Sequence, residues 1–387
     1  MHNNPLFKMA AIRSMIVVTT VLLLSMSSTS SSRNSLQDSI DQAVQSEMER
    51  QKAVGVAIGV IQNGKIIHTS GYGWADQEKM IPVQRGTMFR WASISKPLTA
   101  VAAMQLVEQD QLDLDADIRL VVPEFPDKGK RITMRQLLGH LGGIVHYRNG
   151  PVVKTSRTYG ESHPHKDVVL ALDRFKESPL VAEPGAEFAY TTHGYILASA
   201  VIQRSGKQPY HLQVRDRVTR PLKLNTLQPD YQWQSIPGRA VGYRRKDGKI
   251  VPSRDTNVSW KLGGGGWISN IGDLASFAEA LMTDELVSAE SRKIMWTRQR
   301  NAEGKQLTYG LGFGISGSGD SMRITHSGSQ EKTRTRLTIY PEQGHGVVIM
   351  TNSEYADPEQ FTKAIYKAMT DHQQQFGPEK DRIPYPD

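Results

Sequence analysis

The sequence predicts a mixed fold (α/β, or α+β), in which an antiparallel sheet built from both chain ends is flanked by helices and an inserted, mostly helical region. Three observations support this prediction. A hairpin signal lies near each end of the chain, a helical pattern lies outside each hairpin, and the middle has helical patterns separated by long polar loops. We expect a sheet domain of residues 33–98 and 255–387, and a helical region of residues 99–254.

Residues 1–32 have the composition of an export signal. Lys8 and Arg13 precede an apolar run from Met15 to Met26, and a Ser/Thr-rich stretch follows. A bilayer-spanning helix needs roughly 20 apolar residues, and this run is shorter. A cleaved signal is therefore favoured over an uncleaved membrane anchor. We expect an exported protein, periplasmic or secreted, with no stable membrane span after cleavage.

Composition excludes several classes of site. The lysines and arginines that give the formal charge of +8 are scattered along the chain, so we expect no nucleic-acid partner. Cysteine is absent, which excludes disulfides, thiolate nucleophiles and Cys-ligated zinc. Serine, threonine, lysine and the carboxylates remain as candidate nucleophiles.

Local patterns place the outer elements. Apolar residues recur at helical spacing from Leu36 to Met48, and again around Phe361 in a closing helix. Strands 56–61 and 65–70 are joined by Asn63-Gly64, a dipeptide that favours a two-residue turn because both positions need positive φ. A second hairpin is predicted from strands 337–340 and 346–350. In the middle, helical patterns are found at residues 133–138, 168–175 and 195–204.

The segment around Ser93 is the first candidate for chemistry. Residues 94–107 are nearly all apolar or small, which is typical of a fully buried helix. Pro97 is tolerated only in a first helical turn, so the helix must begin at about Ser93. Free N–H groups at a helix start favour a developing negative charge, and Lys96 follows at i+3 on the same face. A bare Ser-x-x-Lys is also typical of an N-cap followed by a solvated lysine.

Two further segments are candidates. Tyr190 lies at a loop-to-helix junction, from which its phenol could point into a cleft, although a half-buried aromatic side chain is the ordinary alternative. His326-Ser327-Gly328-Ser329 lies between two β-like runs. A glycine at a strand edge lets a substrate backbone come close, and free N–H groups there can hold an oxyanion; a polar turn between strands is the alternative.

In order and spacing, these three segments resemble the active-site elements of the penicillin-recognising serine hydrolases, specifically the class C β-lactamase-like branch. That branch includes penicillin-binding proteins, D-Ala-D-Ala carboxypeptidases, D-aminopeptidases, carboxylesterases and mitochondrial serine β-lactamase-like proteins. The resemblance covers essentially the whole mature chain, and the segments 132–144 and 263–269 also look similar to the family. It implies a serine β-lactamase/transpeptidase-like fold.

The resemblance also implies roles for single residues. Ser93 would be the nucleophile, Lys96 its proton partner, and Tyr190 a base for acylation and a proton donor to the leaving group. The N–H groups of Ser93 and Ser329 would form the oxyanion hole. The implied function is hydrolysis of an amide, lactam or ester bond in a small-molecule or peptide substrate through an acyl-enzyme. The alternatives are a carboxylesterase of the same fold and an inactive ligand-binding relative. No cofactor is implied, and no oligomeric state is predicted.

The sequence departs from the family pattern at two motifs. Thr192 stands where the second motif usually has Asn, and His326-Ser327-Gly328 replaces Lys-Thr-Gly. We assign Thr192, Ser327 and Gly328 to substrate binding and His326 to the catalytic group. Because histidine titrates near 6.5, we expect weak β-lactam hydrolysis, better activity on neutral esters or amides, and a KM for anionic substrates that rises with pH through the His326 pKa.

Other charged groups are weighed against simpler roles. Lys332, Arg334 and Arg336 could anchor a carboxylate, but their i, i+2, i+4 spacing is more typical of a solvated strand face. His163-Pro164-His165 is the closest histidine pair, in a polar loop without the helix that orients metal ligands, so no metal site is predicted. We expect three other histidines to make structural hydrogen bonds near the cleft: His140, His146 and His193.

Overall fold

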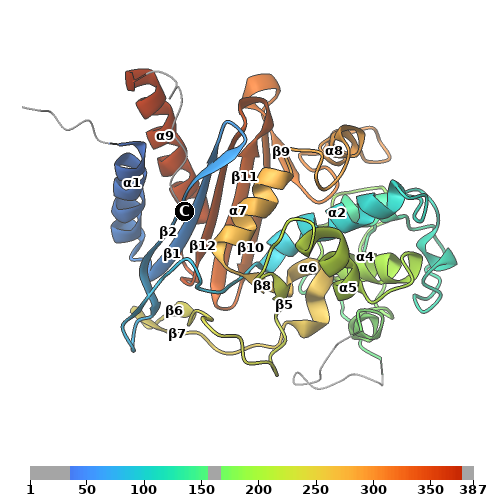
Figure 1. Ribbon diagram of the computed structural model, residues 1–387. Coiled ribbons are helices and arrows are strands. Elements are labelled where there is room, and N and C mark those ends of the chain that lie inside the picture. The colour runs from blue at the N-terminus through green and yellow to red at the C-terminus, as the bar shows by residue number, and fades with distance from the viewer. Residues whose placement is uncertain (1–34, 156–166, 377–387) are drawn as a thin grey trace, which may run out of the picture. The chain divides into compact units, whose positions relative to one another are not determined.

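Strands from opposite ends of the chain pair with one another in one antiparallel sheet. The computed structural model describes residues 35–155 and 167–376, so the predicted export signal and the His163/His165 pair lie outside the described residues. The sheet has seven strands in the order β3-β2-β1-β12-β11-β10-β9 (Figure 1). Their bounds are β1 Gly55–Gln62, β2 Lys65–Asp76, β3 Ile81–Pro82, β9 Gly314–Ser316, β10 Arg323–Gln330, β11 Thr333–Tyr340 and β12 His345–Thr351.

The predicted hairpins form the centre of this sheet. Asn63 and Gly64 have φ values of 51° and 72°, as the predicted turn requires. The second hairpin joins β11 to β12, and β12 then pairs with β1 over the register Val56↔Thr351 to Ile61↔Gly346. The prediction of an antiparallel sheet built from both chain ends is confirmed.

Helices cover both faces of the sheet. On one face lie α1 (Leu36–Gln51) and α9 (Pro358–Phe376), which are the helices predicted at the two ends (Figure 1). They pack on β1 and β12 around a buried apolar cluster. Its members include Ile40, Val44, Val56, Ile58, Val60, Val347, Ile349, Phe361 and Ile365. On the other face α7 (Ile271–Ala280) contacts β1, β2 and β12.

The helical region surrounds one buried helix. Every residue of α2 (Ser95–Val107) from Ser95 to Leu106 is buried, as the apolar run predicted. Around it lie α3 (Met134–Leu138), α4 (Thr192–Ser205), α5 (Tyr210–Val214) and α6 (Leu262–Gly265), while α8 (Ala289–Met295) lies farther along the chain. The patterns at 133–138 and 195–204 are confirmed as α3 and α4, whereas 168–175 forms a short 3₁₀ helix, η3 (Leu170–Arg174).

Short elements complete the described chain. A small sheet of order β4-β8-β5 joins Phe89–Arg90, Trp267–Ser269 and Gln228–Pro229, and β6 (Tyr243–Lys246) pairs with β7 (Lys249–Pro252). Further 3₁₀ turns are η1 Ala92–Ile94, η2 Ile118–Leu120, η5 Ser259–Lys261, η6 Gly319–Ser321 and η7 Pro341–Gln343, and η4 (Arg215–Thr219) is a π-helical turn. Within the parts of the chain that the structure describes, none of the helices combines the length and apolarity needed to cross a bilayer.

Candidate active site

The nucleophile candidate Ser93 lies in η1, directly before α2. The turn begins at Ala92, whose φ of 48° is a left-handed conformation that costs a non-glycine residue about 1 kcal/mol or more. Its neighbour Trp91 is fixed from both sides, because its indole donates to Ser269 Oγ at 2.7 Å and its carbonyl accepts from Thr335 Oγ1 at 2.9 Å. The helix therefore starts within two residues of the predicted position. The turn before it is held in place by the hydrogen bonds of Trp91.

Lys96 contacts Ser93 from the first turn of α2. Its side chain is fully buried, and its Nζ lies 3.0 Å from Ser93 Oγ, 3.3 Å from Thr192 Oγ1 and 3.0 Å from the Gly264 carbonyl oxygen. Among the described residues it has no carboxylate partner within ion-pair distance. Burial, together with the nearby charge of Lys261, lowers the pKa of Lys96 well below its usual value.

The three partners of Lys96 can be bonded in either charge state. An ammonium has three N–H donors and can donate to all three partners. A neutral amine has two N–H donors and one lone pair, so it can donate to the Gly264 carbonyl and the Thr192 hydroxyl and accept from the Ser93 hydroxyl. The neutral form suits a lysine that accepts a proton from Ser93.

Tyr190 lies one residue before the N-cap of α4 and lines the same cavity as Ser93. Burial raises the pKa of Tyr190 above its usual value, and a side-chain hydrogen bond with Ser93 partly opposes this effect. Lys96 Nζ lies 4.7 Å from the centroid of the Tyr190 ring. The phenol is therefore expected to be protonated at neutral pH, the form in which it can donate a proton.

The three histidines expected near the cleft make structural hydrogen bonds, as predicted. The Nδ1 atoms of His140 and His146 accept from the N–H groups of Thr191 and Thr192, at 3.2 Å and 3.1 Å. His193 bonds the Val145 carbonyl at 3.0 Å and stacks on Phe175. Burial lowers the pKa of His146 to about 4 and that of His193 to about 3, so these rings stay neutral.

The β10 segment presents serines to the cleft. Because side chains alternate along a strand, Ser327 and Ser329 are exposed and line the cavity, whereas His326 and Gly328 are buried. β9 pairs only with Arg323–Thr325 of β10, so the described sheet leaves the edge of β10 beyond Thr325 free beside η1.

Gly328 packs against the protein's own backbone on the side where a side chain would lie. A Cβ at this position would lie 2.0 Å from Thr335 Oγ1 and 2.6 Å from the Trp91 carbonyl oxygen. The backbone that approaches closely here is the protein's own, the segment that carries Ser93. The glycine thus allows β10 and the nucleophile turn to pack together.

His326 differs from its predicted role. Its ring is buried beside Tyr309, with Nε2 3.0 Å from the Tyr309 hydroxyl and Nδ1 2.8 Å from the Ser327 carbonyl oxygen. It is absent from the cavity lining, and burial with the nearby charge of Lys96 lowers its pKa to about 3. Because a neutral histidine carries no charge for a substrate anion, we no longer expect His326 to change KM with pH near neutrality.

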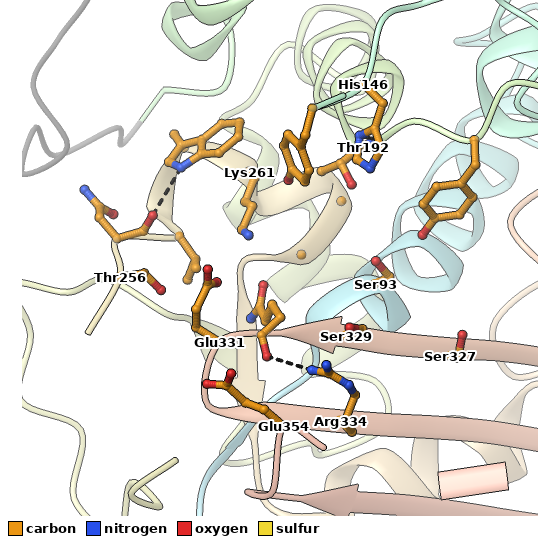
Figure 2. Close-up of a pocket in the computed structure, with 18 of the residues that line it drawn as sticks. Ser93, His146, Thr192, Thr256, Lys261, Ser327, Ser329, Glu331, Arg334 and Glu354 are labelled. Atoms are coloured by element: carbon orange, nitrogen blue, oxygen red, sulfur yellow. Dashed lines mark hydrogen bonds between the residues drawn. The ribbon is translucent and has the colours of Figure 1, made fainter. Parts of the chain in front are cut away.

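The site contains a cavity of about 660 Å³ that is open to solvent (Figure 2). Ser93, Tyr190, Thr192, Ser327 and Ser329 all line it, so the structure brings together most of the predicted site. Several residues that line the cavity were not predicted from the sequence: Tyr147, Arg174, Trp260, Lys261, Glu331 and Glu354. His146 was predicted to lie near the cleft, but not to line the cavity.

Among the residues that the structure describes, no group of three or more His, Asp or Glu side chains could hold a metal ion.

Sequence comparisons find related proteins. A family model described as Beta-lactamase matches residues 40–371. The human protein named serine beta-lactamase-like protein LACTB, mitochondrial (Homo sapiens), is 28% identical over 380 residues, which cover 75% of this chain and 69% of that protein.

Solved structures share the fold. The octameric penicillin-binding protein homologue from Pyrococcus abyssi matches with a TM-score of 0.70 and 25% identity, over 86% of this chain and 76% of that one. EstCE1, described as a hydrolase with promiscuous acyltransferase activity, matches with a TM-score of 0.72 and 21% identity, over 86% of this chain and 98% of that one. The predicted fold class is confirmed.

Proposed function

Because the chain belongs to the Beta-lactamase family, we propose that it is a serine hydrolase that cleaves an amide, lactam or ester bond through an acyl-enzyme on Ser93. One observation carries the proposal: Ser93 Oγ lies 3.0 Å from the Nζ of a lysine that is fully buried and has no carboxylate partner among the described residues. An uncharged amine at that distance is a base for the hydroxyl.

In the proposed acylation, Ser93 Oγ attacks the substrate carbonyl carbon while its proton passes to Lys96 Nζ. The oxyanion accepts hydrogen bonds from the N–H groups of Ser93 and Ser329, at the start of the helix and on the free edge of β10. When the bond to the leaving group breaks, Tyr190 donates the proton that the leaving group needs. Lys96 returns its proton toward Tyr190, and water then releases the acyl group by the reverse sequence.

The electrostatics of the site support this division of roles. Base catalysis near neutrality requires a lysine with a lowered pKa, and proton donation requires a tyrosine that stays protonated. Lys96 and Tyr190 meet these conditions in that order. The alternative in which a charged Lys96 stabilises a Tyr190 phenolate is disfavoured, because burial opposes both charges.

Covalent labelling tests the proposal. We expect a fluorophosphonate probe to add to Ser93 in the wild-type protein, with the modified peptide identified by mass spectrometry. Ser93→Ala should abolish the adduct. Ser95→Ala is the matched control, since the Ser95 hydroxyl is buried two residues away without a hydrogen-bond partner. Persistent labelling of Ser93→Ala would place the nucleophile elsewhere, and a folded wild type that resists all acylating probes would indicate a ligand-binding relative.

A further inference from the structure

A second buried lysine lies in the cleft, and the proposed reaction does not use it. Lys261 ends the η5 turn and lines the cavity that contains Ser93, with only 9% of its surface exposed. Within the described parts of the chain, its ammonium has no hydrogen-bond acceptor and no ion-pair partner. Its neighbours are the rings of Tyr147 and Trp260, 5.9 Å and 5.8 Å from Nζ to the ring centroids. A largely buried cation without a protein partner has to be satisfied from the cavity that it lines, by water or by an anion.

We propose that Lys261 anchors a carboxylate of the substrate, so that the enzyme prefers acyl compounds that carry a negative charge near the scissile bond. This inference rests on the proposed function of Ser93, because it names the substrate class of the same cleft. It reverses the expectation, drawn from His326, that neutral esters and amides are preferred.

The cations of β11 and its preceding turn are already engaged elsewhere. Lys332 binds Asp255 at 2.7 Å, and Arg336 pairs with Glu359. Arg334 lines the cavity, but its guanidinium donates to the carbonyls of Gln330 and Thr333 at 3.2 Å and 3.0 Å. Of these four cationic side chains, Lys261 is the one whose charged group donates to no acceptor among the described residues.

The carboxylate nearest in the cleft does not occupy the lysine. Figure 2 shows Glu331 and Lys261 directed into the same part of the cavity from opposite sides. Glu331 is exposed, and its carboxylate lies beyond ion-pair distance of the lysine. It raises the pKa of Lys261 through space, against the larger effect of burial. An incoming substrate carboxylate can therefore take the position that Glu331 leaves open.

The position of Lys261 relative to the nucleophile is fixed by the chain that follows it. Gly264, three residues later, accepts the hydrogen bond from Lys96. A Cβ at Gly263 would lie 2.3 Å from the Tyr195 carbonyl oxygen, and one at Gly264 would lie 2.7 Å from Thr192 Cγ2. This segment therefore packs in close contact with α4. A carboxylate bound at Lys261 would thus be held in a constant position with respect to Ser93.

Two pairs of esters test the proposal, each matched except for a carboxylate. The first pair is p-nitrophenyl butyrate and mono-p-nitrophenyl succinate, which differ on the acyl side. The second is phenyl acetate and para-acetoxybenzoate, which differ on the leaving side. We expect the wild type to have a higher kcat/KM for the charged member of at least one pair. Lys261→Met should reduce that preference by about tenfold or more, the usual effect of losing a charged hydrogen-bond partner. Lys293→Met, which removes an exposed lysine of α8, should retain it.

Binding to an inactive protein separates this inference from the proposed function. Ser93→Ala should bind mono-p-nitrophenyl succinate or para-acetoxybenzoate in calorimetry. Adding Lys261→Met should raise the Kd about tenfold without changing the Kd of the neutral partner. If esters are not hydrolysed but this difference is found, the proposed function fails and the anion site stands.

Glu331→Gln supplies a second variant, which removes the competing carboxylate and leaves Lys261 intact. We expect it to lower the Kd of the charged ligand and to leave that of the neutral ligand unchanged. Equal preferences in wild type and Lys261→Met for both pairs, or a wild type that favours the neutral members, would overturn the assignment.

Discussion

Two lysines in the cleft are both buried, yet their environments suit opposite charge states. The Nζ of Lys96 lies within hydrogen-bond distance of three polar partners, and burial lowers the pKa of Lys96 well below its usual value. Lys261 has aromatic neighbours and no acceptor among the described residues, and burial lowers its pKa only to about 8. At neutral pH the first is expected to be a base and the second a cation.

The charges around Lys261 determine how it should titrate. Burial lowers its pKa, as do the positive charges of Arg90 and Arg174, while Glu331 and Asp230 raise it. Since a lysine is protonated below its pKa, the ammonium that would hold an anion is present at neutral pH. It is lost as the pH rises through about 8.

We therefore predict that the KM for mono-p-nitrophenyl succinate rises as the pH increases through about 8. The KM for p-nitrophenyl butyrate should stay nearly constant, because it carries no charge for Lys261 to bind. Initial rates measured across this range for both esters, in wild type and in Lys261→Met, provide the check. Parallel profiles for the two esters in the wild type would contradict the prediction.

Tyr190→Phe should slow reactions according to their leaving group. The protonated phenol is needed where the leaving group must gain a proton, so we expect anilide or peptide amide hydrolysis to fall by about 10²-fold or more. p-Nitrophenolate leaves without protonation, so release of p-nitrophenol should fall less. Single-turnover acylation rates measure both. An equal loss with amide and ester would instead indicate that Tyr190 serves Ser93 in the attack.

The role of a single residue could be predicted only where a short sequence motif also determines where its side chains lie. The i+3 spacing on a helix start placed Lys96 beside Ser93, and the structure shows this contact. His326 was misplaced because the sequence does not reveal which face of β10 is directed at the cleft. Lys261 was missed because its partners come from distant segments: Tyr147 lies beside it only after the chain has folded.

At the scale of elements, the site depends on how closely β10 and η1 approach. Thr333 and Thr335 of β11 donate to the carbonyls of Arg90 and Trp91, and Gly328 leaves room for this contact. The strand and the nucleophile turn thus form one packed unit, in which the free N–H groups of both can face a single oxyanion.

Gly328→Ala tests this packing. The added Cβ would meet Thr335 Oγ1 and the Trp91 carbonyl oxygen, so we expect a loss of about 1–3 kcal/mol in the free energy of unfolding and slower labelling of Ser93. Urea denaturation and the fluorophosphonate reaction measure the two effects. Gly86→Ala is the control, since no atom lies within 4 Å of a Cβ there. Full labelling at wild-type stability would show that the approach is less close than described.

Elements with local signals were predicted well, and those made by distant pairing were not. The Asn63-Gly64 turn and the apolar periods of α1 and α9 are encoded within short stretches. The strands β4, β8 and β5 are two or three residues long and exist because Phe89, Gln228 and Ile268 meet across the fold. No local pattern could indicate them.

At the scale of the whole molecule, the sheet separates two apolar cores. The smaller core lies under α1 and α9, and the larger one includes α2, α4 and α7 on the side of the cleft. The architecture could be predicted because both ends of the chain carry hairpin signals. The course of residues 99–254 could not, because its loops have no periodicity.

Phe361→Ala should affect stability without affecting catalysis. The Phe361 side chain is fully buried in the smaller core, so its truncation should lower the free energy of unfolding by about 3–5 kcal/mol. The kcat/KM of the folded protein should remain unchanged, because the sheet lies between this core and the cleft. Chemical denaturation and ester hydrolysis below the transition give both values. Leu120→Ala, at a 79% exposed position, should change neither. A loss of activity in folded Phe361→Ala would show that the two cores are coupled.

The pairing of α1 with α9 means that the order of the chain could be rearranged. Figure 1 shows that α1 begins and α9 ends at the same end of this helix pair, on the face of the sheet away from the cleft. A short linker could join Phe376 to Leu36, and new termini could be opened at the exposed turn around Gly304, where an added Cβ would meet no atom of the described residues within 4 Å. Such a circular permutant would keep every contact of the site while the hairpins that now come from opposite ends of the chain became neighbours in sequence.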